Sequence, residues 1–212
     1  MFSTRMLRTT MAVLALGLTG FAPGAAADSQ EGAGSIKADM MFWIGDAESK
    51  LIELLDATPE EKFAWRPAEG VRSTGEVFMH VAGANYGIPS FWGVAPPEGF
   101  KFETWEKSLT KKEDIKAALG TSFAHMKNSL ESADDAALTK PVEMFGMKTS
   151  VRGAYMLLLS HAHEHLGQSI AYARSNGIAP PWTARQNAQI EAAAAKAKEG
   201  AAKKDEHAGH KH

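Results

Sequence analysis

The chain has no cysteine among its 212 residues. Disulfide bonds, thiolate ligands for a metal and cysteine nucleophiles are therefore all excluded. A lipid-modified N-terminus is excluded as well, because no cysteine follows the apolar stretch near the start of the chain. Stability must come from an ordinary apolar core.

A strong excess of charge of either sign is also absent. The 23 lysine and arginine residues and the 25 aspartate and glutamate residues give a formal net charge of −2. Nucleic-acid binding demands basic side chains clustered on one face, which this balance does not favour. We therefore expect no nucleic-acid partner.

The N-terminal apolar run is too short to span a bilayer comfortably. Residues 11–21 provide only about a dozen positions, whereas a spanning helix needs about 20. Two arginines precede this run, and three small residues ending at Ala27 follow it. This pattern predicts a secretory signal peptide over residues 1–27 and a linker over residues 28–34. We expect a periplasmic or secreted protein without stable membrane insertion after cleavage, with an uncleaved anchor as the alternative.

Large apolar residues are missing from the C-terminal end as well. After Ile190 the composition is dominated by alanine, lysine, glutamate and glycine, which cannot bury a face. The sequence predicts a disordered tail over residues 186–212, with any helix in it transient and unpacked. The tail ends in a cluster that binds metal loosely or is simply solvated, formed by His207, His210 and His212.

The remaining residues, 35–185, have the length of one domain and a helical pattern. Apolar residues recur at helical spacing over residues 35–57, from Ser73 to about Trp92, from Thr110 onward and over residues 149–176. Four amphipathic helices without a convincing run of strands predict an all-α fold, a four-helix bundle.

Start and stop signals refine these helices. Ser73 and Thr110 each precede a glutamate by three residues, which is the pattern of a capping box, and Thr58 before Pro59 is a further start signal. Gly177 is a natural terminator for the last helix. The loop over residues 93–105 is long enough for a crossover connection, and a short hairpin around Gly146 precedes the last helix.

Three histidines give the sequence its sharpest functional signal. His161 and His165 lie four residues apart, so their rings project from one face of a helix, and that face is the apolar one. His80 lies on the apolar face of an earlier helix. Paired inward imidazoles are hard to satisfy without a cation or water, so the sequence predicts a three-nitrogen metal site with an open position. The alternative is a set of hydrogen-bonded core histidines.

The other histidines, amides and aromatic residues near these three are not expected to bind the metal. His163 and His125 are expected on the surface or in structural roles. A zinc-protease motif is excluded, because Ala162 stands where that motif requires glutamate. Gln168 and Asn85 allow a role in orienting a ligand, although a polar bond within the core is the preferred interpretation. Aromatic residues that could wall a pocket, but are more often core, are Tyr86, Trp92 and Trp105.

Three segments together resemble the DinB-like superfamily. They are FAWRPAEG at residues 63–70, RSTGEVFMHV at residues 72–81 and HAHEHLGQ at residues 161–168. The resemblance implies a four-helix bundle with a long crossover and a divalent metal, zinc or nickel, held at the positions of His80, His161 and His165. It also implies that a homodimer is to be expected. Similar proteins include some that use thiol cofactors, which an export signal makes doubtful here.

The sequence leaves the function open among three interpretations. The first is a metal-dependent hydrolase or lyase acting on a small-molecule substrate, with the open metal position lowering the pKa of water. The second is a non-catalytic carrier, sensor or structural bundle. No aspartate or glutamate can be placed beside the histidines as a general base from the sequence alone. A plain helical scaffold is the third reading.

Overall fold

A computed structural model describes residues 34–208. The expected signal peptide and nearly all of the expected linker lie outside the described residues, as do His210 and His212. Between residues 34 and 208, no helix is both long and apolar enough to cross a membrane.

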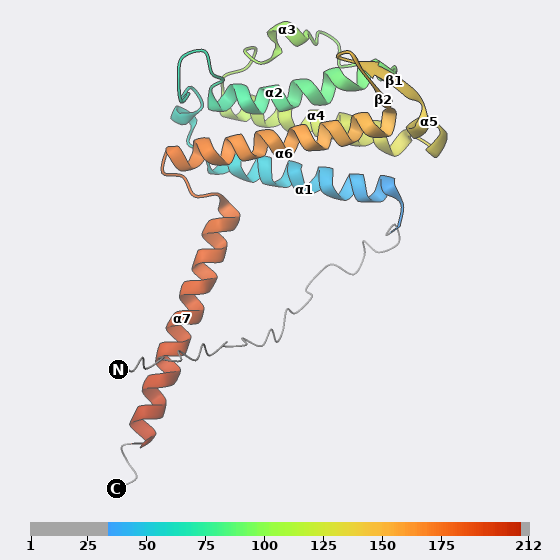
Figure 1. Cartoon of the computed structure of the whole chain (residues 1–212). Helices are drawn as coiled ribbons and strands as arrows, with labels where there is room; N and C mark the ends of the chain where they lie inside the picture. Colours follow the sequence, from blue (N-terminus) through green and yellow to red (C-terminus); the bar gives the residue numbers. More distant parts are fainter. Residues whose placement is uncertain (1–33, 209–212) are drawn as a thin grey trace, which may run out of the picture. The chain divides into compact units, whose positions relative to one another are not determined.

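The four helices that pack together are α1 (Ile36–Ala57), α2 (Thr74–Gly87), α4 (Lys112–Ser132) and α6 (Val151–Ser175). Both α1 and α2 pack against α4 and against α6 (Figure 1). The shorter elements are α3 (Phe102–Trp105), α5 (Asp135–Thr139) and the strands β1 (Pro141–Met144) and β2 (Met147–Ser150). The predicted all-α four-helix bundle is confirmed, and so is the hairpin around Gly146.

The connection after α2 is a crossover, as the length of that loop predicted. An added Cβ on Gly75 near the start of α2 would lie against Ile115 near the start of α4, and Asn85 later in α2 contacts Ser122 later in α4. The two helices therefore run parallel. Residues 88–111 must return along the bundle to join them, and α3 lies within this return (Figure 1). We call residues 93–111 the strap.

The core is built from the apolar stripes of the four packed helices. In α1, α4 and α6 this spacing places one face inward, whereas α2 is buried on nearly every side because the strap covers the face that the other helices leave open. The burial of each large apolar side chain contributes about 1.5–3 kcal/mol before the entropy of ordering the chain is subtracted. Residues with no exposed surface include Ile44, Leu51, Leu55, Phe78, Met79, Leu119, Phe123, Met126 and Leu158.

Two of the predicted start signals differ from the structure. The capping box at Ser73 is present, with the Ser73 side chain accepting from the Glu76 backbone and the Glu76 carboxylate accepting from Ser73. The box predicted at Thr110 does not form, because α4 begins only at Lys112. The Lys112 amine instead donates to the carbonyl groups of Asp56 and Thr58, which ties the start of α4 to the end of α1. A short 3-10 helix (Glu60–Lys62) does follow Thr58 and Pro59, but the Thr58 side chain does not cap it and instead donates its hydroxyl to the Leu54 carbonyl of α1.

The C-terminal segment differs as well. Where disorder was expected from residue 186, the structure continues as helix α7 (Pro181–Ala208). Residues 184–199 of this helix are all exposed, so it does not pack as a fifth member of the bundle. Alanine, lysine and glutamate have among the highest helix propensities, which explains a helix without a buried face. Arg185 pairs with Glu53 of α1 at 2.9 Å.

Candidate metal centre

The three histidines predicted from spacing converge in the structure. One ring nitrogen each from His80, His161 and His165 lies within 4.8 Å of the other two. The Nε2 atoms of His80 and His161 are 3.0 Å apart. Tetrahedral zinc with nitrogen ligands at 2.0–2.1 Å would separate those nitrogens by about 3.3 Å. The distance between His80 and His161 is therefore close to that expected for two ligands of one small divalent cation.

Helix geometry explains the convergence. His161 and His165 project from one face of α6, and their ring centroids are 4.4 Å apart. His80 projects from α2, and its ring centroid lies 4.8 Å from that of His161 and 4.6 Å from that of His165. His165 is buried, while the other two rings are partly exposed. The pairing of α2 with α6 thus brings together residues that are about 80 positions apart in the chain.

Glu106 orients His80, a contact that the sequence analysis missed. The His80 Nδ1 donates to Oε1 of Glu106 at 2.5 Å. Arg72 donates to both oxygens of the same carboxylate, from Nε and Nη2, at 2.9 Å each. A carboxylate only accepts, so Nδ1 of the neutral ring carries the proton and Nε2 keeps its lone pair. Glu106 lies in the strap, where no helical period indicates its direction.

Gln168 orients His165 in the same manner. The His165 Nδ1 lies 2.8 Å from Oε1 of Gln168, and Nε2 of Gln168 donates to the hydroxyl of Tyr172 at 2.9 Å. The Tyr172 ring in turn packs edge-on against Trp65. Gln168 thus has the orienting position that its spacing allowed, rather than the core bond that was preferred. Asn85 makes that core bond instead, donating to Ser122 at 3.2 Å.

His161 has no such partner. Its Nδ1 is buried and, among the described residues, makes no hydrogen bond. Burial first, and then the neighbouring rings of His165 and His80, lower the pKa of His161 to about 3. Its ring is therefore neutral at ordinary pH, which is the form that binds metal.

The pKa values of His80 and its partner Glu106 both lie below their ordinary values. Burial lowers the pKa of His80, although the hydrogen bond to Glu106 opposes this effect. Burial would raise the pKa of Glu106, but hydrogen bonds from Arg72 and His80 outweigh it, so that pKa lies below its ordinary value. The Glu106 carboxylate is thus charged and held by two partners.

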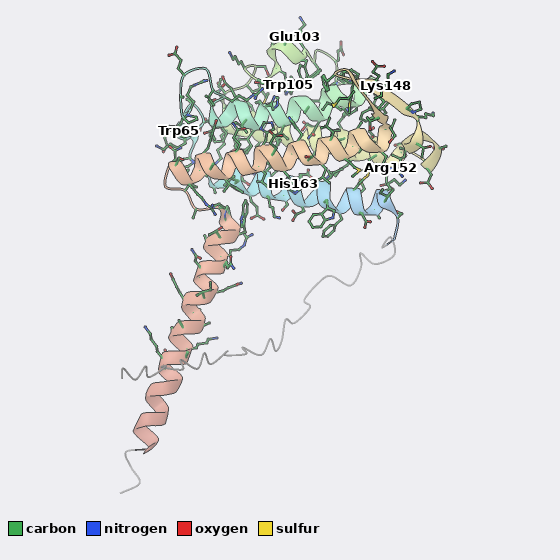
Figure 2. All side chains as sticks on the ribbon, in the orientation of Figure 1. Trp65, Glu103, Trp105, Lys148, Arg152 and His163 are labelled. Carbon is green, nitrogen blue, oxygen red and sulfur yellow. The ribbon has the colours of Figure 1, made fainter. Side chains whose placement is uncertain are left out.

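The other residues singled out from the sequence lie away from this cluster. His163 is exposed on α6 (Figure 2), and His125 packs against the ring of Tyr86. Trp105 lies between α3 and α2 (Figure 2), packed edge-on against Tyr86. Trp92 packs against Tyr155. These aromatic residues are packing residues of the bundle and strap rather than walls of the cavity beside the histidines.

None of the three histidines lines that cavity, which has a volume of about 530 Å³, within the range of small-molecule sites. It is lined by Glu106 and Gln168, the two side chains that orient His80 and His165, and by Arg66, Gly70, Val71, Arg72, Glu76 and Lys107. A small molecule in the cavity would therefore lie next to the residues that hold the histidines. Sequence reasoning missed the charged lining because four of its five charged residues, Arg66, Arg72, Glu106 and Lys107, come from irregular segments, and only Glu76 lies on a packed helix.

The residues fit a divalent cation on their own chemistry. Two rings present unprotonated Nε2 atoms, the third ring is neutral, and its buried Nδ1 has no protein partner within the described chain. Three neutral ligands leave the full charge on the cation and leave a position open to a further ligand.

Comparison with known proteins agrees with the fold. A family model described as the DinB superfamily matches residues 45–169. A DinB-like protein from Bacillus cereus is 24% identical with a TM-score of 0.59, and the match covers 69% of this chain and 95% of that one. YfiT from Bacillus subtilis, described as a probable metal-dependent hydrolase with an unusual four-helix bundle topology, is 13% identical with a TM-score of 0.56, covering 68% and 89%. No curated protein matches the chain.

Proposed function

The chain belongs to the DinB superfamily, and on this premise we propose that it binds one divalent metal ion through His80, His161 and His165 and uses it in a hydrolase or lyase reaction. We propose zinc or nickel as the metal, as the family resemblance implies, and neutral imidazole nitrogens suit both ions. The observation that carries the proposal is the convergence of the three rings. The Nδ1 atoms of His80 and His165 are engaged by Glu106 and Gln168, and the Nδ1 of His161 has no partner among the described residues.

The bound cation would supply Lewis acidity at an open position. The residues of the chain supply everything else. Glu106 and Gln168 hold two of the rings in the tautomer that directs Nε2 inward. The adjacent cavity admits a small-molecule substrate and borders both orienting side chains. The description of YfiT from Bacillus subtilis as a probable metal-dependent hydrolase supports hydrolysis as the reaction.

A second candidate, a non-catalytic metal carrier or sensor, is favoured by one observation. The two carboxylates that line the cavity are both held in ion pairs, Glu76 with Arg66 and Glu106 with Arg72. Neither is free to act as a general base in this arrangement. Turnover by metal-loaded protein of a panel of esters, amides and thiol compounds separates the two candidates, because a carrier binds the ion without turnover.

The metal proposal is tested by metal analysis of purified protein reconstituted with zinc or nickel. We expect His161→Ala to lose one bound ion per chain relative to wild type. His163→Ala is the matched control, because His163 is exposed on the same helix and its Nδ1 faces only the carbonyl of Leu159. Equal metal content in the two variants would overturn the proposal.

We also propose that the protein is exported, on the strength of the pattern at residues 1–27. The protein is produced in a cell that has a secretory pathway, and its N-terminus is determined by mass spectrometry. We expect a mature N-terminus at Asp28 in the periplasmic or secreted fraction. An intact Met1 in the cytoplasmic fraction would contradict export.

A further inference from the structure

We propose that the 530 Å³ cavity beside the histidines binds an anionic group, a carboxylate or a phosphate, of a small-molecule ligand and that Lys107 contacts this group directly. The inference deepens the proposed function, because it concerns the ligand class of the same site.

The charged lining is the first argument. Three cationic side chains, Arg66, Arg72 and Lys107, face the cavity together with two carboxylates. The carboxylates are those of Glu76, which pairs with Arg66 at 3.2 Å, and Glu106, which pairs with Arg72 at 2.9 Å. One positive charge is left over. A divalent ion held by the histidines would lie behind the lining residues Glu106 and Gln168 and would add two positive charges nearby, so the cavity attracts anions.

Lys107 carries the excess charge. Among residues 34–199, whose side chains the structure describes, its amine has no ion-pair partner within 4.0 Å, whereas both arginines have one. It directly follows Glu106 in the strap, so its position is tied to the residue that orients His80. A second cavity of about 230 Å³ also includes Lys107 and Glu106 in its lining. The Lys107 amine has three N–H donors, and no described side chain accepts from them. They are therefore available to an acceptor on a bound ligand.

Arg72 adds directional donors. Its Nε and Nη2 atoms are engaged with Glu106. A guanidinium has five N–H donors, so the Nη1 group is left over for a ligand. Planar donors of this kind suit carboxylate and phosphate oxygens. Ligands with only donors to offer, such as ammonium compounds, would have to compete with Arg66 and Arg72 for the two lining carboxylates.

The test uses the full chain loaded with zinc and freed of excess metal. Inorganic phosphate and succinate are titrated separately by calorimetry at low ionic strength, where surface charges are least screened. We expect wild type to bind at least one of them and Lys107→Ala to bind it about fivefold more weakly, with Lys107→Glu weaker still. The tighter probe identifies phosphate or carboxylate as the preferred group.

Lys101→Ala is the matched control. Lys101 is exposed in the same strap but lines a different cavity, beside Phe91 and Phe102, so its loss should leave both affinities unchanged. The proposal is overturned if neither anion binds, or if Lys107→Ala and Lys107→Glu bind both anions as wild type does. Repeating the titration with His161→Ala separates the proposals, because binding that still depends on Lys107 supports the anion site even where the metal proposal has failed.

Discussion

The Nδ1 atom of His80 lies 2.5 Å from Oε1 of Glu106, a residue 26 positions later that belongs to none of the four packed helices. Because Arg72 grips the same carboxylate with two hydrogen bonds, the His80 ring is linked through Glu106 to the start of its own helix. The strap is therefore part of the candidate metal centre and not only a connection.

We expect Glu106→Gln to weaken zinc binding by about 10- to 100-fold, the usual range for the loss of a residue that orients a metal-binding histidine. The amide loses the charge that holds both Arg72 and the His80 proton. Competition against a chelator of known zinc affinity measures the change. Glu103→Gln is the control, since Glu103 is exposed in the neighbouring turn of α3 (Figure 2). Equal zinc affinities in the two variants would show that Glu106 has no role in zinc binding.

The helical faces could be predicted from the sequence, and the irregular segments could not. Periodicity placed His80, His161 and His165 inward, because helix geometry fixes the direction of each side chain. Glu106, Arg72 and Lys107 lie in segments where backbone direction changes from residue to residue, so their meeting depends on tertiary packing. Tertiary packing also accounts for the absent capping box at Thr110. There the amine of Lys112 donates to the carbonyl groups of Asp56 and Thr58 at the end of α1, a contact that the local sequence does not indicate.

Gly83 in α2 allows the strap to lie close to the helix. A Cβ added at Gly83 would be 3.0 Å from Cδ1 of Trp105, the residue before Glu106. We therefore expect Gly83→Ala to displace Trp105 and Glu106 and to weaken zinc binding several-fold. Chelator competition measures this loss.

Gly120→Ala is the matched control for that variant, because a Cβ at Gly120 in α4 meets nothing within 4 Å. It should raise the free energy of unfolding by up to about 1 kcal/mol through helix propensity and leave zinc affinity unchanged. Should Gly83→Ala behave like Gly120→Ala in both measurements, the close contact would have no role in holding the strap.

The stability of the metal-free protein should depend on pH through His161. Burial and the neighbouring rings lower its folded-state pKa to about 3, whereas the unfolded chain titrates near 6.5. Between these values the unfolded state binds more protons, so stability is lost as the pH falls below about 6.5 and is regained as it rises. Urea unfolding in the presence of a chelator, from about pH 7 to about pH 5, measures the slope. His161→Gln should flatten it, and an unchanged slope would assign the effect elsewhere.

Removal of residues 186–212 should leave the candidate metal centre intact. The exposed part of α7 from 186 to 199 buries no face, while the ion pair of Arg185 with Glu53 is retained. We expect about one tightly held zinc ion per truncated chain and an unchanged midpoint of thermal unfolding. Metal analysis and calorimetry measure both. A truncated chain without zinc would show that the tail histidines, rather than the bundle, held the ion.

The histidines lie on the packed helices and the cavity-lining residues lie partly in the strap, which limits how far a substrate assignment can be carried from one relative to another. Helices α2 and α6 carry the three imidazoles, whereas Glu106 and Lys107 of the strap line the 530 Å³ cavity. Loops tolerate exchange of residues far better than packed helix faces do. Two members of the superfamily can therefore share the same histidines and yet act on unrelated compounds, so a substrate assigned to one is no guide to another unless the segment between α2 and α4 also agrees.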